Sequence, residues 1–247
     1  MNDEVKIVWS FVLRLSSFIF SLMPPLTHYK AKQVSVNHKR HYEIEGHCYP
    51  GITTILSATK PYEDKKRLWD WQDRIGQDEA RRITTKSARS GSRIHKVIKS
   101  HLKQEPYELP AGLEGFWHSI EPVLAEVNEV LLVEGAVWHP LKFGGYPDAV
   151  MRYEGELCLC DWKTARRPKQ IEWIEDYCLQ VAAYCYAVNW VYRDTGIKID
   201  RGMIAIALEN HPAQVFMLDA DELFHYWQNF QIRLKQYYRR QWYTSGV

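Results

Sequence analysis

The stretch from residue 145 to 163 restricts the fold of this chain more than any other. Two apolar segments of the kind that form strands, 145–153 and 156–163, flank Glu154-Gly155, a pair suited to a two-residue hairpin turn. A hairpin centred on that turn places 153 opposite 156 and 151 opposite 158. Directly opposed residues of an antiparallel pair point to the same face. The register therefore predicts that Asp148 and Asp161 converge.

Charges stand where an apolar hairpin would not be expected to hold them. Asp148, Asp161 and Lys163 lie among apolar residues, and an unpaired buried charge is costly. Because side chains alternate along a strand, Lys163 should project from the same face as Asp161. Two close carboxylates repel each other unless a cation lies between them, and oxygen ligands suit Mg²⁺. An ammonium beside that ion can stabilise charge on a reacting phosphate. The alternative is an Asp–Lys ion pair on an exposed strand.

Composition indicates one domain in a reducing compartment. With 247 residues and 46% hydrophobic residues, the chain can bury a full core. The 32 Lys and Arg residues nearly balance the 30 Asp and Glu residues, so net charge alone does not indicate a polyanionic partner. The five cysteines follow neither a secreted disulfide pattern nor the ligand spacing of an iron–sulfur cluster. We therefore expect reduced thiols and no iron–sulfur cluster.

The first residues form an apolar leader of unknown role, which we assign to 1–27. Asp3 and Glu4 do not fit a secretory signal or a mitochondrial presequence, and Arg14 is unfavourable in a transmembrane helix. A loosely attached leader, a docked helix, and a membrane or organelle signal remain alternatives. Membrane contact would run through residues 5–23.

Residues 28–247 are expected to form a single domain. Its parts are an N-terminal hairpin and helices in 28–111, the core in 112–218 and a C-terminal helix in 219–247. The expected elements are a hairpin within 41–56 that leads into a helix, helical structure over 64–103 with breaks near Gly76 and at Ser90-Gly91-Ser92, a helix over 113–126, strands at 130–138, 145–153 and 156–163, a helix over 174–192, strands at 201–208 and 213–217, and a helix that Asp219 and Glu222 open as a capping box. The middle of the chain is thus α-β-β-β-α-β.

This pattern resembles the PD-(D/E)xK nuclease superfamily, whose core is αβββαβ. The signature stands here as Pro147-Asp148 followed by Asp161-Trp162-Lys163. The segments "GSRIHKVIKS" and "QVAAY" are similar to the RecB-like branch, and from about residue 40 the chain resembles the family of the mitochondrial genome maintenance exonuclease and its bacterial relatives. The resemblance implies an α/β fold with a restriction-endonuclease-like αβββαβ core, a mixed central sheet and added N-terminal and C-terminal helices.

The resemblance also implies site residues. Catalytic roles would belong to Asp148, Asp161 and Lys163, and the metal site would be completed by His95, Glu134 and the Trp162 carbonyl. The implied cofactor is Mg²⁺, with Mn²⁺ as the alternative, and no small-molecule cofactor. Gln180 and Tyr184 would lie beside the hairpin and touch the substrate or the catalytic strand.

The residues alone leave the roles of four of these positions open. His95 borders an apolar helical stripe, where a lone histidine can equally be a packed core residue. Glu134 at a strand end can equally be solvated. Gln180 and Tyr184 are one helical turn apart and could serve only in helix packing.

Basic residues recur at helical spacing before the hairpin. They are Arg82, Lys86, Arg89, Arg93, Lys96 and Lys103, and three more cations follow the Asp161 triplet, namely Arg166, Arg167 and Lys169. On a continuous helix the first six form one stripe, which we interpret as a track for DNA phosphates. The alternative is a solvated helix face, and a break at Ser90-Gly91-Ser92 could rotate its two halves apart. Trp69, Trp71 and Tyr107 are candidates for stacking on bases.

The resulting hypothesis is a metal-dependent deoxyribonuclease. We expect an exonuclease that acts on single-stranded DNA ends in DNA maintenance or repair, and its preference for single strands and ends follows from the resemblance alone. We expect it in the cytoplasm with the nucleoid, or alternatively in the mitochondrial matrix. One alternative function is a structure-specific or restriction-like endonuclease. Another is a catalytically silent DNA-binding module, against which the three intact residues Asp148, Asp161 and Lys163 argue.

Overall fold

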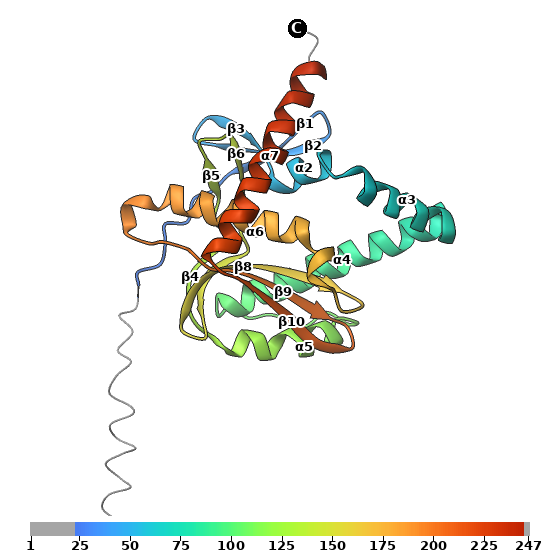
Figure 1. The fold of residues 1–247 in the computed structure, drawn as a ribbon. Coiled ribbons are helices and arrows are strands. Elements are labelled where there is room, and N and C mark those ends of the chain that lie inside the picture. The colour runs from blue at the N-terminus through green and yellow to red at the C-terminus, as the bar shows by residue number, and fades with distance from the viewer. Residues whose placement is uncertain (1–22, 245–247) are drawn as a thin grey trace, which may run out of the picture.

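A five-stranded mixed sheet lies at the centre of the computed structural model, which describes residues 23–244 (Figure 1). Its strand order is β10-β9-β8-β7-β4. The strands are β4 (Val127–Val133), β7 (Ala149–Tyr153), β8 (Glu156–Ala165), β9 (Gly202–Leu208) and β10 (His211–Leu218). β8 and β9 are parallel, and the other neighbours are antiparallel. The predicted α/β class with a mixed central sheet is confirmed.

Helices cover both faces of this sheet. On one face lie α4 (Gln77–Leu102) and α5 (Glu114–Ala125), and on the other lie α6 (Glu175–Val191) and α7 (Ala220–Thr244). Successive side chains of β8 point to opposite faces of the sheet. Cys158 and Cys160 therefore lie in the core under α4 and α5, and Leu159 lies in the core under α6 and α7. With β4, β7 and β9, these helices complete the predicted αβββαβ core.

Local sequence signals account for the start of the C-terminal helix α7 and for the end of the crossover helix α6. Asp219 and Glu222 exchange hydrogen bonds, with Asp219 N donating to Glu222 Oε2 at 3.0 Å and Glu222 N donating to Asp219 Oδ1 at 2.9 Å. The predicted capping box is therefore confirmed. α6 carries β8 into the parallel strand β9, and it is followed by the short 3₁₀ helix η2 (Arg193–Thr195) and by Gly196 in the left-handed region.

Two predicted strands are each divided. Residues 130–138 form the end of β4 and the separate strand β5 (Val137–His139), while 145–153 splits into β6 (Phe143–Gly145) and β7. β5 and β6 pair as a two-stranded sheet of their own. Glu134 adopts a φ of +49° after β4, and Pro147 before β7 has no N–H to donate to a ladder. The prediction of continuous strands was wrong at both places.

Helix α3 (Tyr62–Ile75) and the start of α4 project from the body (Figure 1). No residue of α3 is buried, and Gly76 between the two helices has a φ of +86°. The predicted break near Gly76 is confirmed, but the predicted break at Ser90-Gly91-Ser92 is wrong, because α4 is continuous through it. A Cβ on Gly91 would lie 3.2 Å from Thr164 Oγ1, so glycine lets the helix lie close to β8.

The N-terminal part forms a second, smaller sheet. Its strands are β1 (Lys32–Val36), β2 (Lys39–Ile44) and β3 (His47–Pro50), and α2 (Ile52–Ala58) follows. The predicted hairpin turns at Glu45-Gly46 as expected, whereas β1 was not predicted. The helix after this hairpin joins the main core through Ile52, Ile55 and Leu56.

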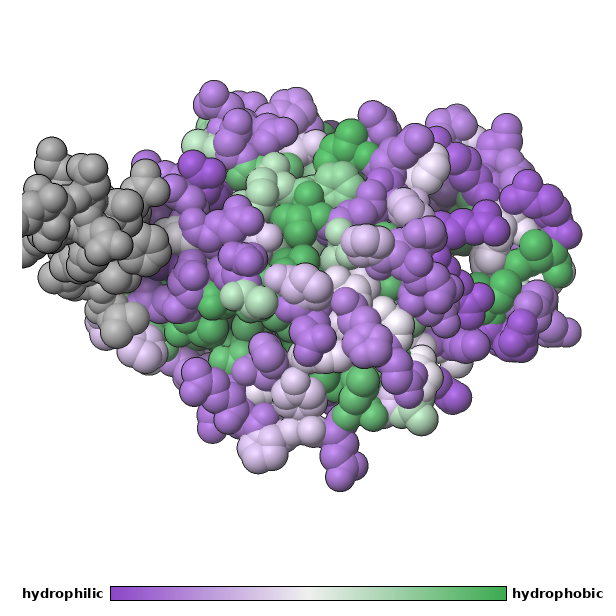
Figure 2. Space-filling model, turned by 90° about the horizontal axis from the view of Figure 1, so that it is seen from below, coloured by the Kyte–Doolittle hydropathy of each residue, from purple (hydrophilic) through white to green (hydrophobic). Residues whose placement is uncertain are grey.

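Residues 23–31 run beside β4. Leu26 N donates to Leu131 O at 2.9 Å, Ala136 N donates to Tyr29 O at 2.9 Å, and Leu26 is buried. Residues 1–22, which hold most of the predicted leader and of the segment considered for membrane contact, lie outside the described residues. Between residues 23 and 244, none of the helices is long and apolar enough to cross a membrane. Seen from below, the molecule is mainly hydrophilic, with apolar side chains in small groups (Figure 2).

Candidate active site

β8 extends beyond its neighbour β7 at one end. The ladder between them begins at the turn with Tyr153 opposite Glu156 and ends with Ala149 opposite Cys160, so the predicted register is confirmed. Residues 161–165 pair only with β9. Asp148 stands just before β7 and turns its carboxylate over this open edge, where Trp162 N donates to Asp148 Oδ2 at 2.8 Å. Residues 148 and 161, which the predicted register places opposite each other, therefore lie just past the end of the ladder.

Asp161 is almost fully buried beneath α6. Gln180 Nε2 donates to Asp161 Oδ1 at 2.9 Å, while Oδ2 is in ion-pair contact with Lys163 Nζ. Burial raises the pKa of Asp161 to about 6, although the charge of Lys163 opposes the rise. The negative charge of Asp148 adds to it. A buried carboxylate whose pKa is raised by burial and by a second carboxylate is a group that a cation would stabilise in its charged form.

Lys163 has three partners on the same side of β8. Besides the Asp161 carboxylate, Nζ donates to Gln180 Oε1 at 3.3 Å and lies 5.0 Å from the centre of the Tyr177 ring. Burial by itself would lower the pKa of Lys163, but Asp161 and Asp148 outweigh it and raise the pKa. The side chain is therefore an ammonium that is held in a largely dry place.

His95 faces Asp148 from α4. Its Nδ1 lies 3.6 Å from Asp148 Oδ1, and burial opposes protonation of the ring, but the adjacent Asp148 carboxylate outweighs it and raises the pKa of His95. Burial would also raise the pKa of Asp148, yet His95, Lys163 and the Trp162 N–H together lower it. The core stripe of α4 is made instead by Ile94 and its apolar neighbours. The structure thus places His95 in the charged cluster.

Glu134 lies near the cluster but is engaged elsewhere. Its N–H donates to Asp148 O at 3.1 Å, and its carboxylate forms an ion pair with Lys99. Among residues 23–244, no group of three or more His, Cys, Asp or Glu side chains is close enough to hold a metal ion as it stands. The predicted ligands therefore lie near one end of β8 in separate pairs. His95 faces Asp148, Lys163 pairs with Asp161, and Lys99 pairs with Glu134.

The donor chemistry at this end of β8 nevertheless fits a hard divalent cation. Asp148 is close enough for its charge to raise the pKa of Asp161, and the buried Asp161 Oδ2 already pairs with one cation, the Lys163 ammonium. Carboxylate oxygens with a nearby imidazole suit Mg²⁺ or Mn²⁺. Trp162 donates its N–H to Asp148 and buries its indole under α4 and α5, and its carbonyl remains a predicted ligand.

Gln180 and Tyr184 occupy one face of α6 against the site. Gln180 bridges Asp161 and Lys163, so it lies beside the hairpin as expected from the resemblance. Tyr184 is buried, and a Cβ on Gly145 would lie 2.8 Å from its hydroxyl oxygen. Tyr184 thus supports the end of β6 that leads into Asp148.

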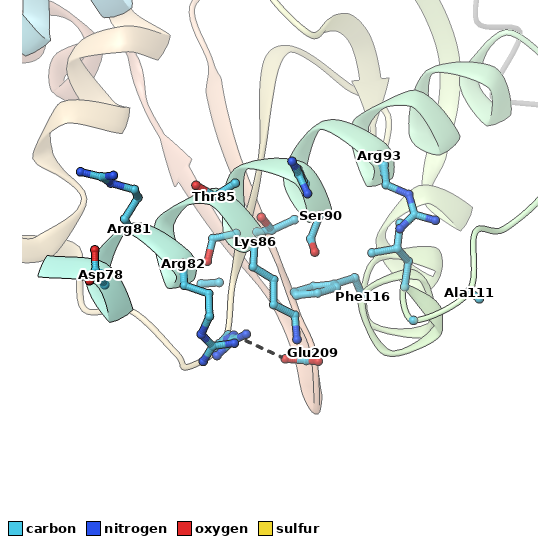
Figure 3. Close-up of a pocket in the computed structure, with 17 residues that line it drawn as sticks. Asp78, Arg81, Arg82, Thr85, Lys86, Ser90, Arg93, Ala111, Phe116 and Glu209 are labelled. Atoms are coloured by element: carbon cyan, nitrogen blue, oxygen red, sulfur yellow. Dashed lines mark ion pairs between the residues drawn. The ribbon is translucent and has the colours of Figure 1, made fainter. Parts of the chain in front are cut away.

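A basic groove of about 740 Å³ runs between α4, the start of α5 and the β9–β10 turn, and Thr164, the residue after Lys163, is among its lining residues. Its cationic lining residues are Arg81, Arg82, Lys86, Arg89, Arg93 and Arg166. Figure 3 shows Arg82, Lys86 and Arg93 on the side of α4 that faces Glu209, whereas Arg81 points away. Arg166 Nε lies 3.9 Å from Glu209 Oε2. Because α4 is unbroken, most of the predicted stripe shares this groove.

The remaining predicted contacts are spread over neighbouring surfaces. Lys96 lines a smaller pocket with His95 and Lys99, and Lys103 pairs with Glu105 at 3.9 Å. Arg167 is exposed, and the backbone of Lys169 is fixed by Gln214, which accepts from its N–H at 2.7 Å and donates to its carbonyl at 3.0 Å.

The aromatic candidates lie on α3 and in the loop after α4. Trp69 packs edge-on against Tyr62 on α3 with ring centres 6.2 Å apart, and Trp71 lies on the same helix. Tyr107 packs on Trp117 at 5.3 Å beyond the end of α4. Their stacking on bases stays a prediction.

Sequence reasoning missed Tyr177 and Lys99. Tyr177 stands one turn before Gln180 on α6, and this spacing could have indicated that both face β8. Lys99 stands one turn after His95 on α4, so its approach to Glu134 followed the same helical rule. Lys99 lies within the quoted segment "GSRIHKVIKS" but was given no role, and Tyr177 belongs to none of the quoted motifs.

The buried cysteines lie on opposite sides of the sheet. Cys158 and Cys160 are in the core under α4 and α5, while Cys178 and Cys185 are in the core under α6 and α7. Burial raises the pKa of Cys158 to about 12 and that of Cys178 to about 11. These thiols serve packing rather than reactivity.

An αβββαβ core with two aspartates and a lysine at the open end of its third strand defines a class of nucleases. The chain belongs to the PD-(D/E)XK nuclease superfamily, whose family model matches residues 56–242. It is similar to Mitochondrial genome maintenance exonuclease 1 of Mus musculus, at 32% identity over 209 residues, and of Homo sapiens, at 30% over 207 residues. These matches take in 80% and 78% of this chain, which spans 61% and 59% of the length of those relatives.

Proposed function

We propose that this protein is a metal-dependent deoxyribonuclease that removes nucleotides from single-stranded DNA ends in DNA maintenance or repair. The observation that carries the proposal is the contact of Lys163 with Asp161 beside Asp148, on the strand whose next residues, Thr164 to Arg166, line the basic groove. The names of the similar proteins support an exonuclease.

The proposed cofactor is Mg²⁺, with Mn²⁺ as an alternative. Nucleases of this superfamily generally use divalent metal ions. Asp148, Asp161, His95 and the Trp162 carbonyl would hold the ion, and Glu134 could join them on leaving Lys99. When bound, the ion withdraws charge from the phosphate and makes a water molecule more acidic.

The protein's own groups supply position and charge. Lys163 remains an ammonium at neutral pH, and its contacts aim it along the face that Asp161 occupies. An ammonium there stabilises the negative charge that builds up on a phosphate during displacement. Asp148 is kept ionised by its neighbours, so it is available as an oxygen ligand. The expected product carries a 5′-phosphate.

The basic groove is the proposed path of the DNA backbone. Its six cationic lining residues stand against two acidic ones, Asp78 and Glu209, in a chain whose net charge is only +2. Cations are therefore concentrated where a strand would approach Lys163. Phosphate contacts of this kind position a strand without reading its sequence.

The test uses end-labelled linear and circular single-stranded DNA with Mg²⁺, Mn²⁺, Ca²⁺ or EDTA. We expect cleavage of the linear strand with Mg²⁺ or Mn²⁺, none with EDTA, and an intact circle. Asp161→Asn serves as the inactive control. Cleavage of the circle would instead support an endonuclease, and binding without cleavage in every metal would support a silent DNA-binding module.

We also propose that the protein acts on nucleoid DNA in the cytoplasm, with the mitochondrial matrix as the alternative. The free cysteines support a reducing compartment. Fractionation of cells that express a C-terminally tagged chain tests this, and recovery with membranes would contradict both locations.

A further inference from the structure

Tyr177 stands under the ammonium of Lys163 although it belongs to none of the quoted motifs. It lies in the first turn of α6, directly after the 3₁₀ helix η1 (Ile171–Trp173), and its ring centre is 5.0 Å from Lys163 Nζ. A cation within about 6 Å of an aromatic ring is attracted by the electron-rich face. This contact is part-buried, where such attraction exceeds that at an exposed site.

The ring differs in kind from the other two partners of Lys163. Asp161 is a proposed metal ligand, so its carboxylate has to serve two cations. Gln180 donates to that same carboxylate and is therefore tied to it. The ring face of Tyr177 contacts Lys163 without sharing in the bonds of Asp161. It can keep hold of the ammonium when the surroundings of the carboxylate change.

The first turn of α6 is itself firmly held. Asp176 accepts from Lys60 Nζ at 3.2 Å and from Arg233 NH1 at 3.3 Å. Arg233 is buried and also donates to Thr59 Oγ1 at 2.7 Å, which joins α2 and α7 to this turn. The backbone of Tyr177 donates to Ile174 O at 2.8 Å. These contacts fix the position of the helix turn that carries the Tyr177 ring.

We propose that Tyr177 is a positioning residue, whose ring face holds the Lys163 ammonium in place for the reaction. This inference rests on the proposed nuclease function. In this role the face of the ring contacts the ammonium, and the hydroxyl group is not required for the contact. Replacement of the ring by an aliphatic side chain should then affect turnover rather than binding of DNA.

The first experiment compares Tyr177→Leu, Tyr177→Phe and Tyr177→Trp. Single-turnover cleavage with saturating linear single-stranded DNA and Mg²⁺ should slow about tenfold in the Leu variant and stay near wild type in the Phe and Trp variants. The Kd for DNA with Ca²⁺ should stay within about twofold in all of them. Tyr186→Leu is the matched control, since Tyr186 lies on the same helix but stacks on Trp227 with ring centres 4.3 Å apart.

Two outcomes of this experiment would overturn the inference. One is a Leu variant that cleaves at the wild-type rate. The other is a Phe variant as slow as the Leu variant, which would assign the role to the hydroxyl group. An equal loss in Tyr186→Leu would show that any loosening of α6 slows the reaction, and this too would overturn it.

A second experiment does not depend on cleavage. In protein with ¹³C at lysine Cε, the Lys163 signal is identified by its loss in Lys163→Arg. A proton close to a ring face is shifted upfield, so we expect such a shift in the wild type and in Tyr177→Phe, but not in Tyr177→Leu. Its absence from the wild type overturns the inference even if the protein cleaves DNA. Its presence in a protein that cleaves nothing supports the contact and refutes the proposed function instead.

Discussion

Gln180 donates a hydrogen bond to Asp161 at 2.9 Å and so ties α6 to the end of β8 that carries the proposed site. The same side chain accepts from Lys163 at 3.3 Å. One amide thereby fixes the distance between an acid and an ammonium that stand two residues apart on a strand. The arrangement explains why a glutamine is buried among apolar residues of α6.

Replacing this glutamine should cost both stability and activity. In Gln180→Leu the buried Asp161 Oδ1 loses its donor, which should lower the free energy of unfolding by about 1–3 kcal/mol. Urea unfolding measures this loss, and cleavage should slow in parallel. Gln228→Leu is the control on exposed helix surface and should change stability by about 0.5 kcal/mol or less. Equal effects in the two variants would contradict the bridging role.

Removing Lys163 should separate turnover from binding. Lys163→Ala is expected to lower the cleavage rate on the order of 10²-fold or more, comparable to the loss of an oxyanion donor, because the ammonium acts mainly in the transition state. Binding of single-stranded DNA with Ca²⁺ should persist. Lys163→Arg should not restore the rate, since a planar fork cannot replace a compact charge. A near wild-type rate in either variant would reduce Lys163 to an ion-pair partner.

The basic groove predicts a salt-dependent loss of affinity. Changing Arg89 and Arg93 together to Ala should weaken DNA binding on every sequence and reduce the salt slope by about two units or less. Titrations at several salt concentrations measure both. The matched control is the double variant Lys235→Ala and Arg239→Ala on α7, which should leave the slope unchanged. An unaltered slope in the first pair would leave the stripe as a solvated face.

Gly145 predicts a steric conflict that can be relieved. A Cβ at this position would stand 2.8 Å from the Tyr184 hydroxyl, so Gly145→Ala should destabilise the fold by about 1–3 kcal/mol. Combining it with Tyr184→Phe removes the closest atom and should restore part of the loss. Thermal and urea unfolding of the two single variants and the double variant measure the coupling. Strictly additive losses would show that the contact does not exist.

His139 should make stability depend on pH. Burial lowers the pKa of His139 to about 4, below its ordinary value of 6.5, and its Nδ1 accepts from Leu141 N at 3.2 Å. Between pH 6.5 and 4 the unfolded chain therefore binds a proton that the folded ring does not, so stability falls as pH falls. We expect a loss on the order of 2 kcal/mol, since nearby solvent screens part of the difference.

The measurement is urea unfolding of wild type and His139→Leu at pH 7.5 and pH 5. The variant should lose less stability than the wild type on acidification, because leucine has no proton to take up. If the difference between the two proteins is the same at both pH values, His139 does not titrate as described.

How much of the site the sequence could predict depended on how local each contact is. The hairpin register was predictable because Glu154-Gly155 and the strand pattern act over a few residues. Alternation along β8 then placed Asp161 and Lys163 on one face. The break before β7 was not predictable from the apolar pattern, although Pro147 marks it.

Contacts between distant elements could not be predicted in this way. The ion pair of Lys99 with Glu134 requires that α4 cross the end of β4, and the continuity of α4 at Gly91 depends on its packing against Thr164. Intrinsic helix propensity disfavours glycine, and tertiary packing overrides it here. The same holds for Tyr177, whose role is visible only once α6 is docked on β8.

The absence of any buried residue in α3 has an energetic consequence. A helix that contributes nothing to either core can open locally at a small fraction of the free energy of global unfolding. Native-state hydrogen exchange should therefore show fast-exchanging amides in α3 and slow ones in β8 and β9. α4 carries cations of the groove directly after this helix, so a bound strand would order the least stable part of the molecule. Part of the binding free energy would then offset the cost of ordering α3. The affinity for DNA would depend on that cost as well as on the charges of the groove.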